Sequence, residues 1–434
     1  MKAREIIILF LIIIAGVSFY YIYTGKVHIG FDDVEGLMFT IREKFTFEES
    51  QVIEPPFPDV LKVVNSHGNI EVIGSEEKTA TIFFQKEVWR KNEKQAADVS
   101  EKVQILIDRD GDKITVSTNR EEFEKQNLKT HFRIYVPQEM NVEVENSYGL
   151  VSISNVRKTS IKNPYGKVIA SDIEGTLSIH NSYKEVEVEN VLANVELKSK
   201  YSSVLLKNIQ GDVTINHSYG KIELENISQK VEIESPYTEV YGQDLRGHIE
   251  VKSTYRKISL FDIGPATVAG YHSAIEIERA KGNLQIANSY GKARLTQVEG
   301  SLKVEGKDLE VNGRGIVGDE ILISTSYKDT DLTESSGKMT ISISHGNLTL
   351  SPSSVTHPLH ITGEYADITF FWPRGEKYPF EARAKNGEIN WKLPAEISSW
   401  EDEQTTVLRA FLGEKEQPFV YISTTYGNIL VEEY

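Results

Sequence analysis

The sequence contains no cysteine. Disulfide bonds, thiolate metal sites and cysteine nucleophiles are therefore excluded. If the chain works outside the cytoplasm, its stability has to come from another source. A long hydrogen-bonded ladder of strands would supply that stability.

Basic residues are the minority charge. The chain has 48 lysines and arginines against 64 acidic residues, a formal net charge of −16. Nonspecific nucleic-acid binding requires basic residues that neutralise phosphates, so no nucleic-acid partner is predicted. The same charge argues against the ordered part lying flat on an anionic membrane.

The sequence also lacks the common catalytic and metal-binding motifs. No H-E-x-x-H, G-x-S-x-G or P-loop pattern is present, and the ten histidines are scattered. Asp108, Asp110 and Asp112 with Gly111 imitate the start of a calcium loop, but the remaining ligands of such a loop are missing. This segment is interpreted as a plain turn. We predict no catalytic residue, no metal and no cofactor, and therefore not an enzyme.

One long apolar run is present, from Ile6 to Tyr23, with no charge in 18 residues. It is long enough for most of a hydrocarbon core of roughly 30 Å. Lys2 and Arg4 precede it and the chain after it turns acidic, so the positive-inside rule places residues 1–5 in the cytoplasm. We predict a single-pass cell-membrane anchor at 6–23, a stalk or linker at 24–56, and an extracytoplasmic remainder. A cleaved signal peptide is the alternative, although no convincing cleavage site follows.

A repeat of about 18 residues occupies most of the chain, and tyrosine marks it. Successive marks are 17 or 18 residues apart from Tyr148 to Tyr255. Tyr271 or His272, Tyr290, Asp308 and Tyr327 continue the series. His345, Tyr365 and Asn386 then follow more loosely, and Tyr426 resumes the series after an insertion.

Each repeat contains two short strands of alternating polarity. After Tyr219, Ile222 and Leu224 alternate with glutamates, and after a polar corner Val231 and Ile233 do the same. Glycine recurs ten residues after the mark, and we expect φ > 0 at these corners. The glycines concerned are Gly175, Gly211, Gly247 and Gly300.

All corners of one type carry the tyrosine and all of the other type carry the glycine, which favours coils stacked directly on one another over antiparallel hairpins. The predicted fold is all-β, a single-stranded β-solenoid (β-helix) of about 18 residues per turn, with equivalent residues about 4.8 Å apart. An antiparallel sandwich or propeller is the alternative.

The regions around the regular array have their own patterns. Residues 57–145 are predicted to begin the solenoid, with a short capping helix near 91–103 that covers an otherwise open sheet edge. A hairpin is expected from Val103 to Thr118. The regular solenoid is assigned to 146–390, and 391–434 to an insertion and a C-terminal cap.

The order of these motifs resembles a known family. Val63 to Ile70 reads Φ-x-N-x-x-G-x-I, a short helix follows, Ile134 to Pro137 reads Φ-x-V-P, and Gly427 to Val431 reads G-x-I-x-V. This arrangement, over about 57–434, resembles the bacterial putative-adhesin family of β-strand-repeat proteins, a domain family of unknown function. The resemblance implies a β-helical, extracytoplasmic or membrane-associated protein, in families whose genes often accompany envelope-stress regulators, and no catalytic residue.

The tyrosines allow two interpretations. They could form a rail that stacks against the sugars of a glycan, or they could stack on one another at identical corners without any ligand. The candidate rail consists of Tyr148, Tyr165, Tyr183, Tyr201, Tyr219, Tyr237, Tyr255 and Tyr290. The polar residues two positions before the mark are expected to form a hydrogen-bonding ladder at the corner. These are Asn146, Asn181, Ser199, Ser253 and Asn288.

Two functions are carried forward. The first is a noncatalytic surface scaffold, adhesin-like or associated with envelope stress, with the membrane and a cell-envelope protein or glycan as partners. The alternative is a carbohydrate-binding or carbohydrate-active β-helix protein that acts on cell-wall or extracellular glycan. The enzyme version of the alternative predicts one turn broken by a loop with clustered charges.

Overall fold

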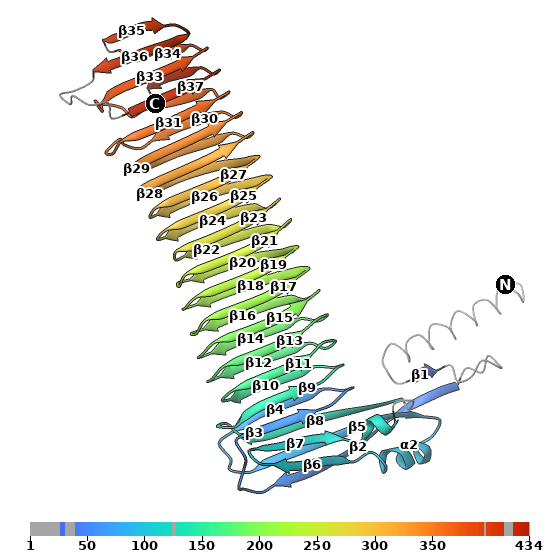
Figure 1. The fold of residues 1–434 in the computed structure, drawn as a ribbon. Helices are drawn as coiled ribbons and strands as arrows, with labels where there is room; N and C mark the ends of the chain where they lie inside the picture. The colour runs from blue at the N-terminus through green and yellow to red at the C-terminus, as the bar shows by residue number, and fades with distance from the viewer. Residues whose placement is uncertain (1–26, 31–39, 124–126, 395, 412–419, 434) are drawn as a thin grey trace, which may run out of the picture. The chain divides into compact units, whose positions relative to one another are not determined.

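The computed structural model describes residues 27–30, 40–123, 127–394, 396–411 and 420–433 (Figure 1). The chain forms two compact units, 1–185 and 186–434, called unit 1 and unit 2 below. The predicted anchor at 6–23 lies outside the described residues. Within the described part, no helix has the length and apolar character needed to cross a membrane.

Unit 2 is a β-solenoid whose coils contain two strands each. Successive first strands pair in parallel, as Val186 does with Val204, and successive second strands do the same, as Val195 does with Val213. The strands of this regular part are β14 (Val186–Val191), β15 (Val195–Lys200), β16 (Ser203–Ile209), β17 (Val213–Ser218), β18 (Gly220–Ile227), β19 (Val231–Pro236), β20 (Thr238–Leu245), β21 (Ile249–Thr254), β22 (Lys257–Ile263), β23 (Ala266–Tyr271), β24 (Ala274–Lys281), β25 (Leu284–Ser289), β26 (Gly291–Glu299) and β27 (Leu302–Lys307). The prediction of a β-solenoid with about 18 residues per turn is confirmed.

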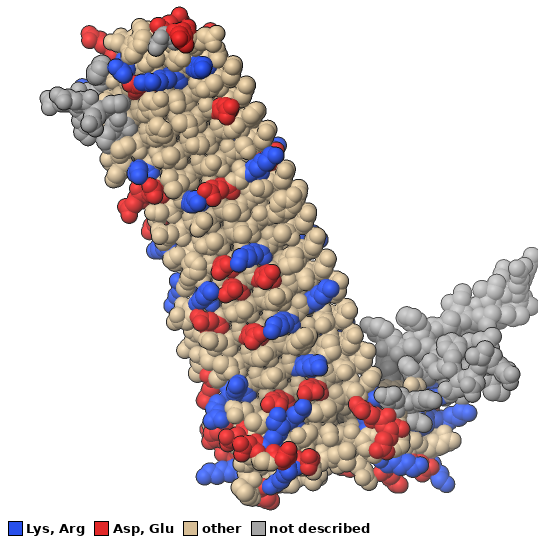
Figure 2. Space-filling view, in the orientation of Figure 1, with Lys and Arg blue, Asp and Glu red and all other residues tan. Residues whose placement is uncertain are grey.

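The core of each coil consists of three apolar residues from the first strand and two from the second. In one coil these are Val204, Leu206, Ile209, Val213 and Ile215, each no more than 1% exposed. Outward residues between them are polar or charged, and Figure 2 shows both signs of charge interspersed on the visible face. Because a coil can bury these few side chains only against its neighbours, stability is a sum of coil–coil interfaces.

The next-to-last residue of the first strand in these coils lies in the left-handed region and bends the strand. Asn155 and Asp172 take this conformation in unit 1, and Asn208, Asn226 and Asp244 do so in unit 2, all with φ of 55–56°. Asparagine and aspartate tolerate this region better than other residues with a Cβ atom. This conformation places two outward residues in succession, and the next apolar residue, such as Ile227, then returns to the core.

The prediction of φ > 0 at the repeated glycines was wrong for three of them. Gly300 has a φ of +138°, whereas Gly175, Gly211 and Gly247 are outside the positive region. These three glycines are required by close approach instead. A Cβ on Gly211 or Gly247 would lie 2.3 Å from backbone carbon of the preceding coil, closer than packed atoms approach.

Unit 1 contains the N-terminal coils and an antiparallel extension of them. Its elements are β1 (Val27–Gly30), β2 (Thr40–Ile53), β3 (Val60–Val64), β4 (Ile70–Ser75), β5 (Ala80–Arg90), α2 (Glu93–Ser100), β6 (Ile105–Asp110), β7 (Lys113–Thr118), the 3-10 helix η1 (Arg120–Phe123), β8 (Leu128–Pro137), β9 (Asn141–Glu145), β10 (Val151–Val156), β11 (Thr159–Asn163), β12 (Val168–Ile173) and β13 (Leu177–Asn181). Strand β3 lies between β7 and β9, and β4 lies between β8 and β10. The first coil in the sequence is therefore not the first in the stack.

Two predicted elements of unit 1 are present and one predicted linker is partly different. Helix α2 lies within 91–103 and packs beside β5, where the Lys86 ammonium donates to the carbonyl oxygens of Ser100 and Val103. Strands β6 and β7 form the expected hairpin around Gly111. Within the predicted stalk, which was expected to have some strand character, β2 pairs antiparallel with β5 from Glu43 to Ile53.

The C-terminal part of unit 2 departs from the order of the sequence. Its strands are β28 (Leu309–Ser326), β29 (Thr330–Ser344), β30 (Leu348–Pro352), β31 (Leu359–Glu364), β32 (Ile368–Trp372), β33 (Pro379–Lys385), β34 (Ile389–Trp391), β35 (Ile397–Asp402), β36 (Thr405–Phe411), β37 (Val420–Thr425) and β38 (Ile429–Glu433). Strand β37 lies between β31 and β33, and β38 lies between β32 and β34. Strands β36 and β35 continue antiparallel from β33.

Candidate functional site: the tyrosine ladder

The tyrosines that mark the repeat form stacks on the surface, hereafter the tyrosine ladder. In unit 1, His67, Tyr148, Tyr165 and Tyr183 stack in that order with centroid separations of 4.7, 4.8 and 5.2 Å. The three tyrosines are 44–50% exposed. The rings therefore point outward.

Unit 2 contains two further stacks. Tyr201, Tyr219, Tyr237, Tyr255, His272 and Tyr290 include consecutive pairs at 5.0–5.1 Å with interplanar angles of 2–20°. After Asp308, which has no ring, a second stack contains Tyr327, His345, Tyr365 and Tyr426 at 4.8–4.9 Å. The predicted order of the last marks was wrong. Tyr426 stacks directly on Tyr365, and Asn386 follows Tyr426, because β37 is inserted before β33.

The sequence left open whether Tyr271 or His272 continues the series. His272 occupies the ladder, while the Tyr271 ring lies edge-on to Tyr255, His272 and Tyr290 at 6.0, 4.4 and 5.6 Å. Tyr271 is 42% exposed and therefore widens the aromatic surface at this coil. The 17-residue spacing before His272 was the sequence signal for this irregularity.

The polar ladder predicted beneath the tyrosines is present. Asn181 donates to the carbonyl oxygens of Asn163 and Gly166, and Ser253 donates to those of Ser235 and Thr238. These side chains are at most 2% exposed. Buried polar groups that bond the backbone of the neighbouring coil hold the corner in register.

His217 occupies one position of this polar ladder. Its Nδ1 lies 2.6 Å from the Ser199 hydroxyl, and the side chain is fully buried. Burial lowers the pKa of His217 from 6.5 to about 4, because desolvation disfavours the charged imidazolium. The ring is therefore neutral at pH 7.

The ladder tyrosines of unit 2 adopt an unusual backbone conformation. Tyr201, Tyr219, Tyr237 and Tyr255 have φ of 54–63°, whereas Tyr148, Tyr165 and Tyr183 of unit 1 are outside the positive region. A bulky residue in the left-handed region costs on the order of 1–3 kcal/mol. Stacking at about 0.5–1.5 kcal/mol per pair offsets much of this cost.

The geometry decides what the ladder can offer a ligand. Each inner ring has a neighbour about 5 Å away on both faces, so a sugar ring cannot insert against those faces. The ladder instead presents ring edges and phenolic hydroxyls to solvent. The Lys200 ammonium lies 4.8 Å from the Tyr201 centroid, which adds a cation at one point. Among the described residues there is no cluster of three or more acidic or histidine side chains suited to a metal ion.

Residues 247–432 match the sequence profile described as Toastrack DUF4097. Somewhat less than half of the chain is thus similar to the family Toastrack DUF4097. This is a β-solenoid family of unknown function, and the resemblance seen in the sequence is confirmed. The match does not indicate an enzymatic family.

Two solved structures are similar to this chain. One is a "putative cell adhesion protein" from Clostridium sporogenes, 11% identical, covering 90% of this chain and 100% of that chain with a TM-score of 0.20. The other is a "putative lipid binding protein" from Parabacteroides distasonis, 10% identical, covering 88% and 96% with a TM-score of 0.20. At this TM-score neither likeness bears on function. No curated protein matches the chain.

Proposed function

We propose that this protein is a noncatalytic scaffold of the cell envelope, adhesin-like or associated with envelope stress. The supporting observation is the regularity of the coils, which present long solvated faces and a tyrosine ladder as contact surfaces. Outward charges are paired along these faces, as in Lys207–Glu225 and Lys292–Glu310 at 2.7 and 2.6 Å. Such pairs keep flat sheets from associating sideways.

The proposal includes a membrane anchor at 6–23 with the solenoid outside the cytoplasm. The uncharged run and the basic residues before it support this topology. The test is fractionation of bacterial cells that express the full chain or a variant lacking 6–23. We expect the full chain in the membrane fraction and digested by protease added to spheroplasts, and the deletion variant released. A full chain that is protected from external protease would contradict the topology.

Binding of a cell-envelope glycan is the second candidate, and the exposed tyrosine ladder favours it. Edges and hydroxyls of the ladder could contact a polysaccharide that runs along it. A pull-down of cell-wall fractions would compare the native chain with Y219A/Y237A/Y255A. The matched control is Tyr241→Ala, which removes a tyrosine from an outward strand face, where its hydroxyl donates to Gln243. Glycan binding requires loss in the triple variant and retention in the control.

A further inference from the structure

One coil of unit 2 is shorter than its neighbours by one residue. Two residues, Gly264 and Pro265, connect β22 to β23, whereas three residues connect β20 to β21. The paired strands keep their register across the difference, with Ala266 opposite Ile249 on one side and Leu284 on the other. The corner between β22 and β23 is therefore one residue shorter than the corner between β20 and β21, and the surface is recessed at the shorter corner.

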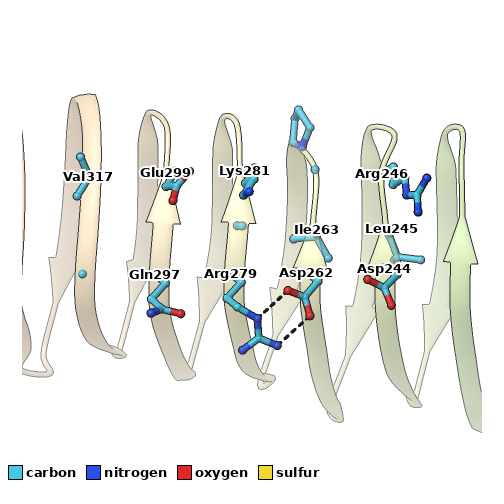
Figure 3. Close-up of a pocket in the computed structure, with 14 residues that line it drawn as sticks. Asp244, Leu245, Arg246, Asp262, Ile263, Arg279, Lys281, Gln297, Glu299 and Val317 are labelled. Carbon is cyan, nitrogen blue, oxygen red and sulfur yellow. Dashed lines mark hydrogen bonds and ion pairs between the residues drawn. The ribbon is translucent and has the colours of Figure 1, made fainter.

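The recess is a shallow hollow of about 700 Å³, hereafter the notch, defined by Arg246, Gly264, Pro265 and Lys281 (Figure 3). The strand register places Arg246 on the coil before Gly264 and Lys281 on the coil after it. Two coil spacings, about 10 Å, separate the backbones of the two basic residues. A Cβ at Gly264 would lie 2.4 Å from the Arg246 carbonyl oxygen, so the close approach of these two coils requires glycine.

One side of the notch is lined by a bidentate ion pair between Arg279 and Asp262. The Arg279 Nε and Nη2 atoms donate to the two carboxylate oxygens of Asp262 at 2.6 and 2.8 Å, and Arg279 also bonds Glu278. This guanidinium lowers the pKa of Asp262. Asp262 and Arg279 therefore satisfy one another and leave little charge for a ligand.

The other charged residues of the notch are different. Within the part of the chain that the structure describes, Arg246, Lys281, Asp244 and Glu299 make no hydrogen bond or ion pair through their side chains. On the strand faces nearby, lysines are paired, as in Lys252–Glu250 at 2.6 Å. The short coil thus brings together two cations and two carboxylates that form no close ion pair, although Lys281 and Asp244 interact electrostatically with the Asp262–Arg279 pair.

These groups define the chemistry of a ligand. An anion between Arg246 and Lys281 would gain charge-assisted hydrogen bonds from both. Asp244 and Glu299 can accept bonds from hydroxyl groups, and Pro265 with Val317, which is 52% exposed, offers apolar contact. A highly charged polyanion is disfavoured by the formal net charge of −16.

We propose that the notch binds one carboxylate-bearing sugar within an otherwise uncharged glycan. The carboxylate lies between Arg246 and Lys281 above Gly264, and the sugar hydroxyls donate to Asp244 and Glu299. This assignment deepens the glycan-binding candidate above and rests on that candidate. The notch does not include the tyrosine ladder, so glycan binding at each of the two surfaces can be tested and refuted independently.

The test is calorimetric titration of the full chain with a hyaluronan tetrasaccharide, which carries glucuronate, and with uncharged tetra-N-acetylchitotetraose. We expect the acidic sugar to bind at least about tenfold more tightly, and R246A/K281A to lose that preference. The matched control is K230A/K252A, which removes one lysine from the corner before β19 and one from β21, both of them paired with glutamates. It should keep native affinity.

Each other outcome overturns the notch. If the acidic sugar does not bind at concentrations up to millimolar, the notch is not its binding site. Equal affinity for the two sugars would also contradict the proposal. Equal weakening by the two double variants would show a general charge effect instead of a site. Competition by sodium sulfate at the same concentration would show an anion site without sugar recognition. Scaffold function, tested by cell fractionation, would stand in all of these cases.

Discussion

The regular coils of unit 2 and its C-terminal coils are built from the same parts in different orders. From β14 to β27 each strand pairs with equivalents in the preceding and following coils of the sequence. At the C-terminus the last strands of the chain, β37 and β38, lie between coils that precede them. Both regions have the same apolar core and ladder corner. The repeat therefore specifies how two coils pack, but it leaves their order open.

Closure of the open sheet edge explains the difference. Strands β36 and β35 pair antiparallel outside β33, so this coil forms the covered end of the stack and the chain returns to fill the gap. Unit 1 uses the same device, with β3 between β7 and β9 and the antiparallel β5 beside β8. Non-sequential coils next to antiparallel strands are thus the way both units end.

The largest effect is expected from deletion of 420–434. Strands β31 and β33 would both lose a parallel partner, and the fully buried Ile422 and Val431 would leave the core. Hydrogen exchange should show lost amide protection across 359–391, with 186–300 unchanged. A peptide of residues 420–433 added in trans should restore protection. Unchanged exchange at 359–391 would contradict the closing role of these strands.

A regular coil can be disrupted at its glycine corner. In Gly211→Ala the added Cβ would lie 2.3 Å from the Ala193 carbonyl carbon, so the two coils must separate. We expect a loss of about 2–4 kcal/mol, measured by urea unfolding. Gly111→Ala is the control, because no atom lies within 4 Å and only its φ of +55° is unfavourable. That change should cost about 1 kcal/mol, and equal losses would rule out the clash.

The coil that contains His217 should be more sensitive to acid than the other regular coils. Because His217 is neutral when buried, with a pKa of about 4, the unfolded state binds a proton first as pH falls below 6.5. This contribution to stability is complete above pH 6.5 and declines by on the order of 2 kcal/mol towards pH 4. His217→Asn, the residue type at Asn181 and Asn288, should abolish that decline in pH-dependent urea unfolding. A decline of the same size in the variant would assign it to other groups.

The smallest effect is expected within the tyrosine ladder. Tyr237→Ala removes stacking at 5.0 and 5.1 Å but keeps a Cβ at a φ of 58°, so we expect a loss of about 1–2 kcal/mol. Tyr237→Asn should lose less, because asparagine tolerates this conformation, as Asn386 does. Thermal unfolding of both variants measures the difference. A greater loss with asparagine than with alanine would contradict the argument that left-handed strain at this position affects stability.

Much of the fold and the residues of the tyrosine ladder could be predicted from local patterns, but the direction of the rings and the notch could not. The alternation of apolar and polar residues around Ile222 and Leu224 predicted the strands and the core. The pattern from Val103 to Thr118 predicted a hairpin. The direction of the tyrosine rings was undetermined, because stacking at a corner is compatible with either side. The notch was visible only as a 17-residue spacing, since the pairing of Asp262 with Arg279 and the unpaired state of Arg246 depend on neighbouring coils.

The sequence by itself determined the β-solenoid, its 18-residue period and the polar ladder beneath the tyrosines, because these follow from alternation and identical spacing. Only the tertiary structure decided that β37 precedes β33 in the stack, that Gly211 serves close approach, and that the ladder faces solvent. Each of these depends on which backbone lies about 5 Å away. Repeats of nearly equal sequence offer many equivalent neighbours, and the closing of the ends selects among them.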